Sequence, residues 1–183
     1  MTTPLEKVFR PTEYLGLTVQ KPQIPDLARR AAEQNGCVEK PEFHISVLVA
    51  SNAQVAWQAV EAQKDAAKIQ QVIESIFNSY TWEYEETHEY FLHERTYAKS
   101  DLIAEGESDV PEHSRRSIVQ KVQFPDLRGF YKKLNDMLKI SLPMPVPHIT
   151  LFAWSDHEPY KTRGIGICSA EEFERFTQQV LQA

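Results

Sequence analysis

Two short motifs in the chain each place a histidine two residues before a hydroxyl side chain. The first pair is His44 and Ser46, and the second is His148 and Thr150. Because side chains two residues apart on a β-strand point to the same side, each motif presents an imidazole beside a hydroxyl. A neutral imidazole takes a proton from an attacking oxygen, and an imidazolium protonates a leaving oxygen. We expect the histidines to be acid and base, in either order, and the hydroxyls to hold phosphate, without a cofactor.

The two motifs occupy matching places in an internal repeat. Residues 18–27 read TVQKPQIPDL and residues 118–127 read IVQKVQFPDL, so seven of ten positions are identical. After each PDL we expect a helix, and after each helix an apolar strand that carries one of the two motifs. This order predicts two similar halves related by a pseudo-twofold axis, which would bring both histidine–hydroxyl pairs to one cleft.

Paired His-x-Ser/Thr strands in duplicated halves resemble the 2H phosphoesterase superfamily, which includes LigT-like RNA ligases and cyclic phosphodiesterases. The similarity covers residues 12–180 and rests on the motifs Phe43-His44-Ile45-Ser46 and Pro147-His148-Ile149-Thr150-Leu151. The resemblance implies a bilobal fold with a central cleft and metal-independent attack on phosphodiesters of ribose 2′ and 3′ oxygens. The substrates that it implies are 2′,3′-cyclic phosphates, 2′,5′-linked oligonucleotides and RNA ends.

Three functions fit these motifs. The first is a phosphodiesterase acting on 2′,3′-cyclic phosphates, 2′,5′-linked ribonucleotides or RNA ends. The second is a nuclease that degrades cyclic oligonucleotide or oligoadenylate signals. The third is a module that binds a nucleotide or RNA end without turnover, or that interacts through an acidic segment. In the first two cases the partner is a ribonucleotide or RNA-end substrate, and we expect a monomer.

Four further side chains near the second motif are candidates for substrate contact. Trp154 lies on the same predicted strand as His148, and alternation puts both on one face, where the indole could stack on a base. Tyr160, Lys161 and Arg163 follow in a loop, where a cation could hold phosphate. For each of the four, a place in the core or a solvated loop position is the alternative.

Other residues of metal-binding types are not expected to form a site. His88 and His93 lie near several glutamates, but a five-residue spacing on a strand puts them on opposite faces, so we predict no metal site. Cys37 and Cys168 are too few for a disulfide framework. We expect them to be inert thiols in a cytoplasmic protein.

The chain of 183 residues is long enough for one domain with a sizeable core. We expect an α+β fold in which two antiparallel sheets and flanking helices surround a central cleft. The predicted lobes are 12–80 and 114–180, with a strand and an acidic loop inserted at 81–113. No apolar run approaches the ~20 residues that span a bilayer, and the first ten residues lack the apolar core of a secretory signal, so we expect no membrane contact.

Periodicity predicts the individual elements. The expected strands cover 13–20, 43–50, 81–97 as one strand or a hairpin, 116–123, 149–154 and 164–167. The expected helices cover 24–34, 52–78, 125–138 and 169–181, the last with Ser169 as its N-cap and Glu172 as capping-box partner. Residues 100–114 are expected to form a mobile acidic loop.

The formal net charge of −6 argues against a broad nucleic-acid-binding surface. The acidity is concentrated in residues 81–113, which hold ten acidic and two basic residues, while the rest of the chain holds 18 basic and 16 acidic ones. The parts that carry the histidines are therefore compatible with an anionic substrate. We expect the acidic segment to lie away from the cleft or to cover only its rim, because carboxylates between His44 and His148 would oppose phosphate binding.

Overall fold

The computed structural model describes residues 6–10, 14–105 and 107–182 of the chain. It has an α+β fold. The strands are β1 (Glu6–Arg10), β2 (Tyr14–Val19), β3 (Val38–Glu39), β4 (Phe43–Leu48), β5 (Glu85–Tyr97), β6 (His113–Gln123), β7 (His148–Ser155) and β8 (Thr177–Leu181). The helices are α1 (Asp26–Gln34), α2 (Ala50–Glu61), α3 (Ala66–Ser79), α4 (Lys99–Ala104), α5 (Asp126–Leu138) and α6 (Ala170–Phe176), with a 3₁₀ helix, η1, at Glu158–Tyr160.

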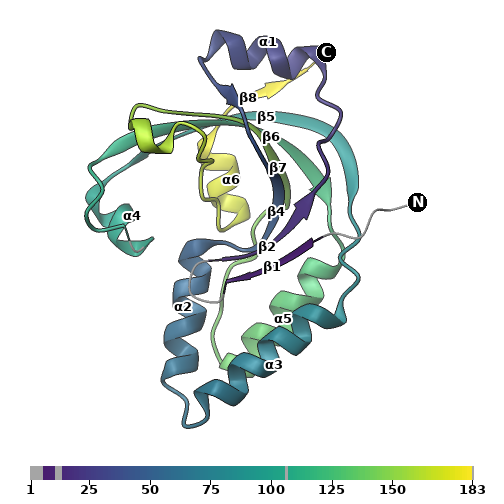
Figure 1. Cartoon of the computed structure of the whole chain (residues 1–183), viewed down its shortest axis with the longest axis vertical. Helices are drawn as coiled ribbons and strands as arrows, with labels where there is room; N and C mark the ends of the chain where they lie inside the picture. The colour runs from purple at the N-terminus through teal and green to yellow at the C-terminus, as the bar shows by residue number, and fades with distance from the viewer. Residues whose placement is uncertain (1–5, 11–13, 106, 183) are drawn as a thin grey trace.

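The strands form one curved antiparallel sheet in the order β1-β2-β4-β7-β6-β5-β8, with β3 pairing beside β7 (Figure 1). We expected two sheets, but β4 and β7 are hydrogen-bonded neighbours, with Ile45 opposite Ile149. Both isoleucine side chains are fully buried, so this junction is shielded from water. The strands of the two repeats therefore belong to a single sheet.

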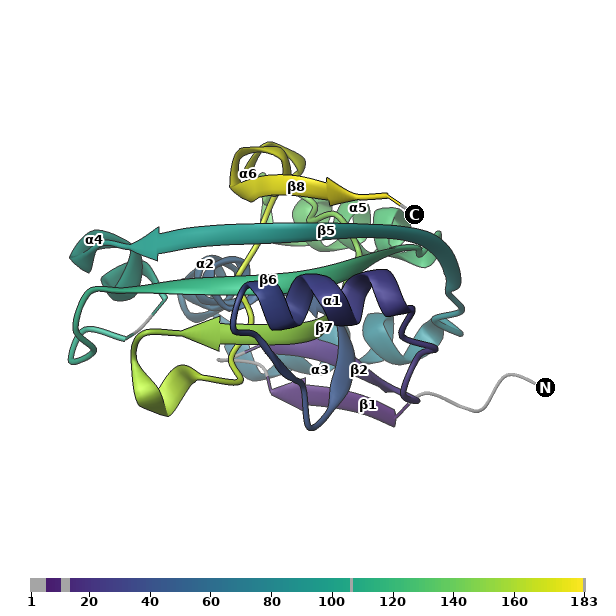
Figure 2. The same cartoon turned by 90° about the horizontal axis from the view of Figure 1, so that it is seen from above.

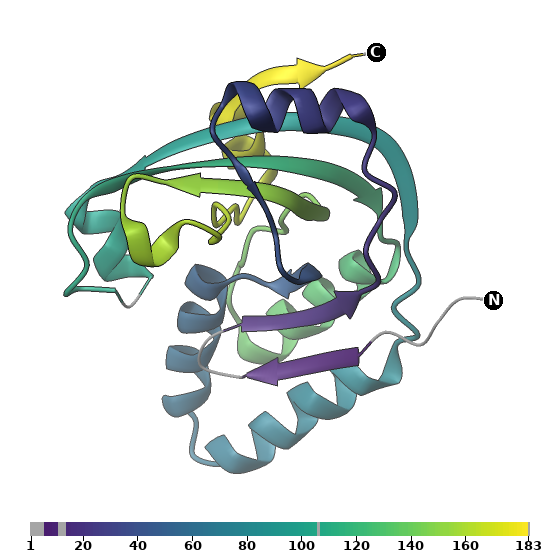
Figure 3. The ribbon, with the colours of Figure 1, turned by 45° about the horizontal axis from the view of Figure 1, so that its top comes forward.

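The helices pack on different parts of this sheet. Helix α1 contacts β6 and β8 and lies over the convex face (Figures 1 and 2). Helices α2, α3 and α5 pack on one another beside β1 and β2 (Figure 3), and α6 contacts β5 inside the curve of the sheet. The helix of the first repeat thus covers strands from the second half of the chain. None of the helices in the described ranges has the length and apolar character needed to cross a membrane.

Both PDL sequences of the internal repeat begin a helix, as predicted. Pro25 and Pro125 directly precede α1 and α5. Asp26 and Asp126 are the first residues of these helices, where the helix dipole favours a carboxylate. The two PDL sequences therefore have the same structural role, the start of a helix, in each half.

The two repeat units share the order strand, helix, strand, but their strand registers differ. In the first unit Thr18 of β2 lies opposite His44 of β4. In the second unit Lys121 of β6 lies opposite His148 of β7, although Ile118 is the residue that matches Thr18 in sequence. The similarity of the halves is therefore visible in the order of elements and not in the register.

Alternation along β4 separates the core from the concave face. Phe43, Ile45 and Val47 are buried in the main core, whereas His44 and Ser46 are half-buried on the opposite face. The same core receives apolar side chains of α5 spaced three or four residues apart, namely Leu127, Phe130, Tyr131, Leu134 and Leu138. A smaller apolar cluster formed by Val119, Ile165, Ile167, Phe173 and Phe176 supports the concave side.

Two of the predicted helices are wrong in extent. The expected helix 52–78 is divided into α2 and α3 by a turn at 62–65, where the polar run 63–65 offers no apolar residue to continue the buried stripe. The expected helix 169–181 ends at Phe176, because the following residues form β8 and pair with β5. Its predicted start is right, since the Glu172 N–H donates to Ser169 Oγ at 3.1 Å.

The elements predicted for 164–167 and 100–114 also differ from the structure. Residues 164–167 form no strand, because their N–H groups bond to side chains: Ile165 donates to Ser117 Oγ at 3.1 Å and Gly166 donates to the Tyr97 hydroxyl at 3.0 Å. The acidic segment contains helix α4, in which Asp101 accepts a hydrogen bond from the Ala98 N–H at 3.0 Å. The preceding strand β5 is a single strand, which pairs with β6 along most of its length.

Replacing Asn52 is expected to destabilise the contact between α2 and α5. The buried Asn52 amide donates to the Tyr131 hydroxyl at 3.2 Å and to the Pro143 carbonyl at 2.9 Å. Asn52→Ala removes both bonds from a buried place and should lower the free energy of unfolding by about 1–3 kcal/mol in urea denaturation. Gln58→Ala, an exposed position on the same helix, is the control; an equal loss in the two variants would contradict this role.

Candidate active site

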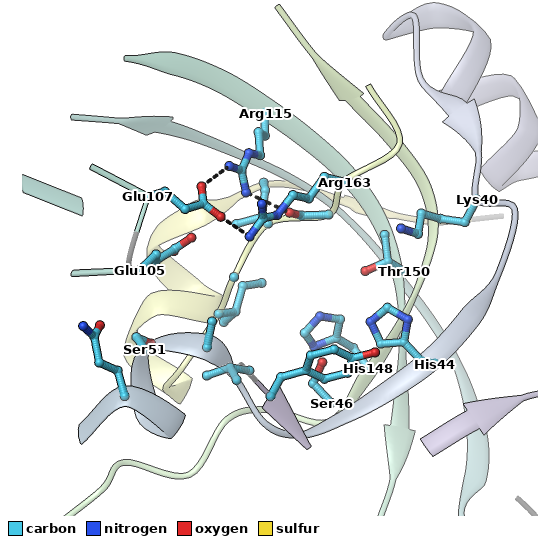
Figure 4. Close-up of a pocket in the computed structure, with 18 residues that line it drawn as sticks. Lys40, His44, Ser46, Ser51, Glu105, Glu107, Arg115, His148, Thr150 and Arg163 are labelled. Carbon is cyan, nitrogen blue, oxygen red and sulfur yellow. Dashed lines mark hydrogen bonds and ion pairs between the residues drawn. The ribbon is translucent and has the colours of Figure 1, made fainter. Parts of the chain in front are cut away.

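The two His-x-Ser/Thr motifs meet at the centre of the sheet. Because β4 and β7 are antiparallel and Ile45 lies opposite Ile149, the strand direction places His44 next to Thr150 and Ser46 next to His148. All four side chains line one cavity of about 650 Å³ on the concave side of the sheet (Figure 4). The structure thus brings together two imidazoles and two hydroxyls from distant parts of the sequence.

Three cations line the same cavity. Lys40 comes from the turn before β4, Arg115 from β6 and Arg163 from the loop after η1 (Figure 4). The first turn of α2 also reaches the wall through Ala50 and Ser51. The N–H groups at a helix start have no partner within the helix and carry partial positive charge, so this wall also favours an anion.

Both cavity histidines are neutral near pH 7. The pKa of His44 is lowered from 6.5 to about 4, mainly by burial and in addition by the nearby charges of Lys40 and His148. Burial also lowers the pKa of His148, which a hydrogen bond to the Val146 carbonyl partly opposes. An anion bound between the imidazoles would reverse this effect by favouring the protonated form of either ring.

The hydrogen bond of His148 defines its tautomer. Nδ1 lies 2.8 Å from the carbonyl oxygen of Val146, which only accepts hydrogen bonds, so Nδ1 carries the proton. The lone pair of the neutral ring is therefore on Nε2. This nitrogen is free to accept a proton from a group in the cavity, and it would donate that proton once the ring is charged.

Lys40 is held close to His44 by the loop that closes the cavity. Its Nζ donates to the Thr162 carbonyl at 2.6 Å. Burial lowers the pKa of Lys40, while the charge of Glu42 raises it and that of Arg163 lowers it. A partly buried ammonium in this place stabilises negative charge in the cavity more strongly than an exposed one.

Two carboxylates from the acidic segment, Glu105 and Glu107, also line the cavity. The prediction that this segment lies away from the cleft or only at its rim is wrong for these two residues. Each is neutralised by arginine: Glu105 lies 3.5 Å from Arg95, and Glu107 pairs with Arg115 at 3.4 Å and with Arg163. They lie at the end of the cavity away from His44 and His148, so they do not separate the imidazoles (Figure 4).

Trp154 does not reach the cavity, contrary to the prediction from strand alternation. The register of β7 shifts by one residue, because Val119 faces Thr150 while Ile118 faces Phe152. This irregularity turns the residues after Thr150 to the other face. The Trp154 ring instead packs against Arg116, whose Cζ lies 4.6 Å from the ring centroid.

The other three candidates near the second motif separate into different roles. Arg163 lines the cavity. Tyr160 lies behind the cavity wall, where its ring packs against Arg115 and Arg163 with ring-to-guanidinium distances of 4.6 and 4.7 Å. Lys161 is exposed and pairs with Glu158 at 2.8 Å, so it belongs to the solvated surface.

Sequence reasoning missed two of the cavity cations, Lys40 and Arg115. Arg115 belongs to neither His-x-Ser/Thr motif, but alternation along β6 puts it on the same face as Ser117 and Val119. That pattern could have identified it. Lys40 lies in a turn, and its position depends on the distant Thr162 carbonyl, so no local pattern points to it.

The chain was compared with protein-family models, with curated proteins and with solved structures, and none of the three comparisons gave a match. In the described ranges, no group of three or more histidine, cysteine, aspartate or glutamate side chains could hold a metal ion.

Acidification is expected to destabilise the fold through the buried histidines. The unfolded chain binds a proton at His44 near pH 6.5, whereas the folded chain does so only near pH 4. The unfolded state therefore binds more protons between these values, and this contribution to stability is present above pH 6.5 and is lost as the pH falls toward 4. The slope from His44 is about 1.4 kcal/mol per pH unit.

Urea denaturation across this pH range measures the effect. In His44→Gln the dependence on pH should be weaker than in the wild type by about that slope. Parallel curves for the two proteins would show that His44 is not buried in its neutral form.

Proposed function

We propose that the protein is a metal-independent phosphodiesterase of the 2H phosphoesterase type, acting on 2′,3′-cyclic phosphates, 2′,5′-linked ribonucleotides or RNA ends. One observation carries the proposal. The pairing of β4 with β7 puts two imidazoles and two hydroxyls on one wall of a cavity that cations also line. Two histidines facing one phosphate supply the base and the acid that phosphodiester hydrolysis requires.

In this mechanism the phosphate lies between His44 and His148. One histidine, in the neutral form, accepts a proton from water as the water oxygen attacks phosphorus. The other histidine, as imidazolium, gives its proton to the ribose oxygen as the bond from phosphorus to that oxygen breaks. The products are a phosphomonoester and a free ribose hydroxyl. The two rings end with their protonation states exchanged.

The remaining groups of the cavity stabilise the negative charge that develops on the phosphoryl oxygens. Ser46 and Thr150 donate hydrogen bonds to the non-bridging oxygens, and Lys40 adds a positive charge beside His44. The bound anion also raises the pKa of the imidazoles, which offsets the effect of burial and makes the protonated form of one ring accessible near neutral pH. Binding of substrate therefore helps to prepare the acid.

The proposal includes a duplicated origin of the two halves. The repeated PDL sequences, the shared order of elements and the antiparallel join at Ile45 and Ile149 support it. A duplication would explain why equivalent motifs approach each other from two strands. The difference in register between the halves would then be a later divergence.

A substrate panel in the presence of EDTA tests the proposed activity. It comprises 2′,3′-cyclic mononucleotides, 2′,5′-oligoadenylate, cyclic oligonucleotides and RNA with defined ends. We expect conversion of a 2′,3′-cyclic phosphate or cleavage of a 2′,5′ bond, detected by separation of the products. Cleavage of cyclic oligonucleotides alone would favour degradation of a signal nucleotide. Binding without any cleavage would contradict an enzyme and favour a binding module.

Removal of one hydroxyl tests its role in the same assay. Thr150→Val keeps the branched shape of the side chain but removes the donor, and we expect kcat to fall by about 10²-fold. Thr96→Val is the matched control, because Thr96 is exposed on β5 and its hydroxyl meets Ser114 outside the cavity. An unchanged kcat in Thr150→Val would remove this residue from the mechanism.

A further inference from the structure

The end of the cavity away from the histidines has two guanidinium groups that share one carboxylate. Glu107 lies 3.4 Å from Arg115 and also pairs with Arg163. The neighbouring Arg95 has two carboxylates of its own, since it pairs with Asp101 at 3.1 Å and with Glu105 at 3.5 Å. The three arginines and three carboxylates of this group balance overall, but Arg115 and Arg163 share a single carboxylate, whereas Arg95 has two.

Arg115 is rigidly held although its ion pair is long. Its side chain is only 1% exposed, and its guanidinium lies between the rings of Tyr97 and Tyr160, at 4.2 and 4.6 Å from their centroids. Its Nε donates to His113 Nε2 at 2.8 Å. The two tyrosine rings and this hydrogen bond therefore fix the orientation of the guanidinium without a carboxylate. Among the described residues, its two terminal nitrogens contact the Gly164 carbonyl at 3.5 Å and Glu107 at 3.4 Å, both long for hydrogen bonds. A phosphate would offer these nitrogens shorter, charge-assisted hydrogen bonds.

A single short loop connects this end of the cavity to the histidine end. Lys40, which lies beside His44, donates to the carbonyl of Thr162. Arg163 follows, and the carbonyl of Gly164 accepts from Arg115 at 3.5 Å. Gly164 also lies against Thr150, because a Cβ at this glycine would be 3.1 Å from the threonine Oγ1. Residues 162–164 therefore contact side chains at both ends of the cavity.

We propose that Arg115 and Arg163 form a second anion-binding site, which takes the second phosphate of a ribonucleotide whose reacting phosphate lies between His44 and His148. The placement of the reacting phosphate rests on the proposed function. The inferred substrate class is a nucleotide or RNA end that carries two neighbouring phosphates, in preference to a cyclic mononucleotide with one. Glu107 holds the two guanidinium groups together when the second phosphate is not bound.

The test compares two pairs of ligands that differ only in a 5′-phosphate. The substrates are adenosine 2′,3′-cyclic phosphate with and without a 5′-phosphate, compared by kcat/KM in the presence of EDTA. The non-reacting ligands are adenosine 3′-monophosphate and adenosine 3′,5′-bisphosphate, compared by Kd in calorimetry. We expect the doubly phosphorylated member of each pair to be favoured about tenfold or more, as one or two charge-assisted hydrogen bonds imply.

In Arg163→Gln, the ratio of kcat/KM values between the two cyclic substrates and the ratio of Kd values between the two non-reacting ligands should both fall close to one. Arg163 is the suitable position because its side chain is 42% exposed, whereas replacement of the buried Arg115 would disturb the core. Lys161→Gln is the matched control: it removes the same charge two residues away, outside the cavity, and should keep both preferences. Retention of the preferences in Arg163→Gln would overturn the second site.

The outcomes also separate this inference from the proposed function. Equal turnover and equal binding within each pair would overturn the second anion site while leaving the phosphodiesterase in place. Tighter binding of the bisphosphate without cleavage of either cyclic substrate would support the second site and contradict the phosphodiesterase.

Discussion

The pairing of β4 with β7 at Ile45 and Ile149 is the constraint on which the site depends. Each isoleucine is the middle residue of its motif and is fully buried in the core, which directs the flanking histidine and hydroxyl to the concave face. The antiparallel direction then sets the imidazole of one motif beside the hydroxyl of the other. Packing of two apolar side chains thus fixes the geometry of four polar ones, and the helices on the convex side hold the strands in place.

The charged groups differ between the end of the cavity near the paired strands β4 and β7 and the opposite end. At the strand end, neutral imidazoles lie next to Lys40, so an anion would be attracted and would in turn stabilise an imidazolium. At the other end, the side chains of Glu105 and Glu107 are only 8% and 11% exposed, and arginines neutralise each of them. Carboxylates from an acidic segment are therefore compatible with a site for phosphate, because they orient guanidinium groups and lie away from the histidines (Figure 4).

Local patterns in the sequence predicted most elements and the four residues at the histidine end of the cavity. The helix starts after each PDL followed from proline and aspartate preferences, and the concave placement of His44 and Ser46 followed from alternation. The predictions that were wrong concern features that depend on contacts between segments distant in the sequence. Pairing with β5 converts the end of a predicted helix into β8, and the irregularity in β7 turns Trp154 away from the cavity. Neither the join of the two halves nor the ion pairs of Glu107 has a local signature.

The measurement that tests the account most directly compares His44→Ala, His148→Ala and the double variant on a 2′,3′-cyclic nucleotide with EDTA. Since acid and base act on one phosphate, each single variant should lose about 10²–10⁴-fold in kcat/KM, and the double variant should lose little more than either one. The exposed His88 provides the control variant His88→Asn, which should retain activity. Full activity in either single cavity variant, or losses that multiply in the double variant, would contradict a shared two-histidine site.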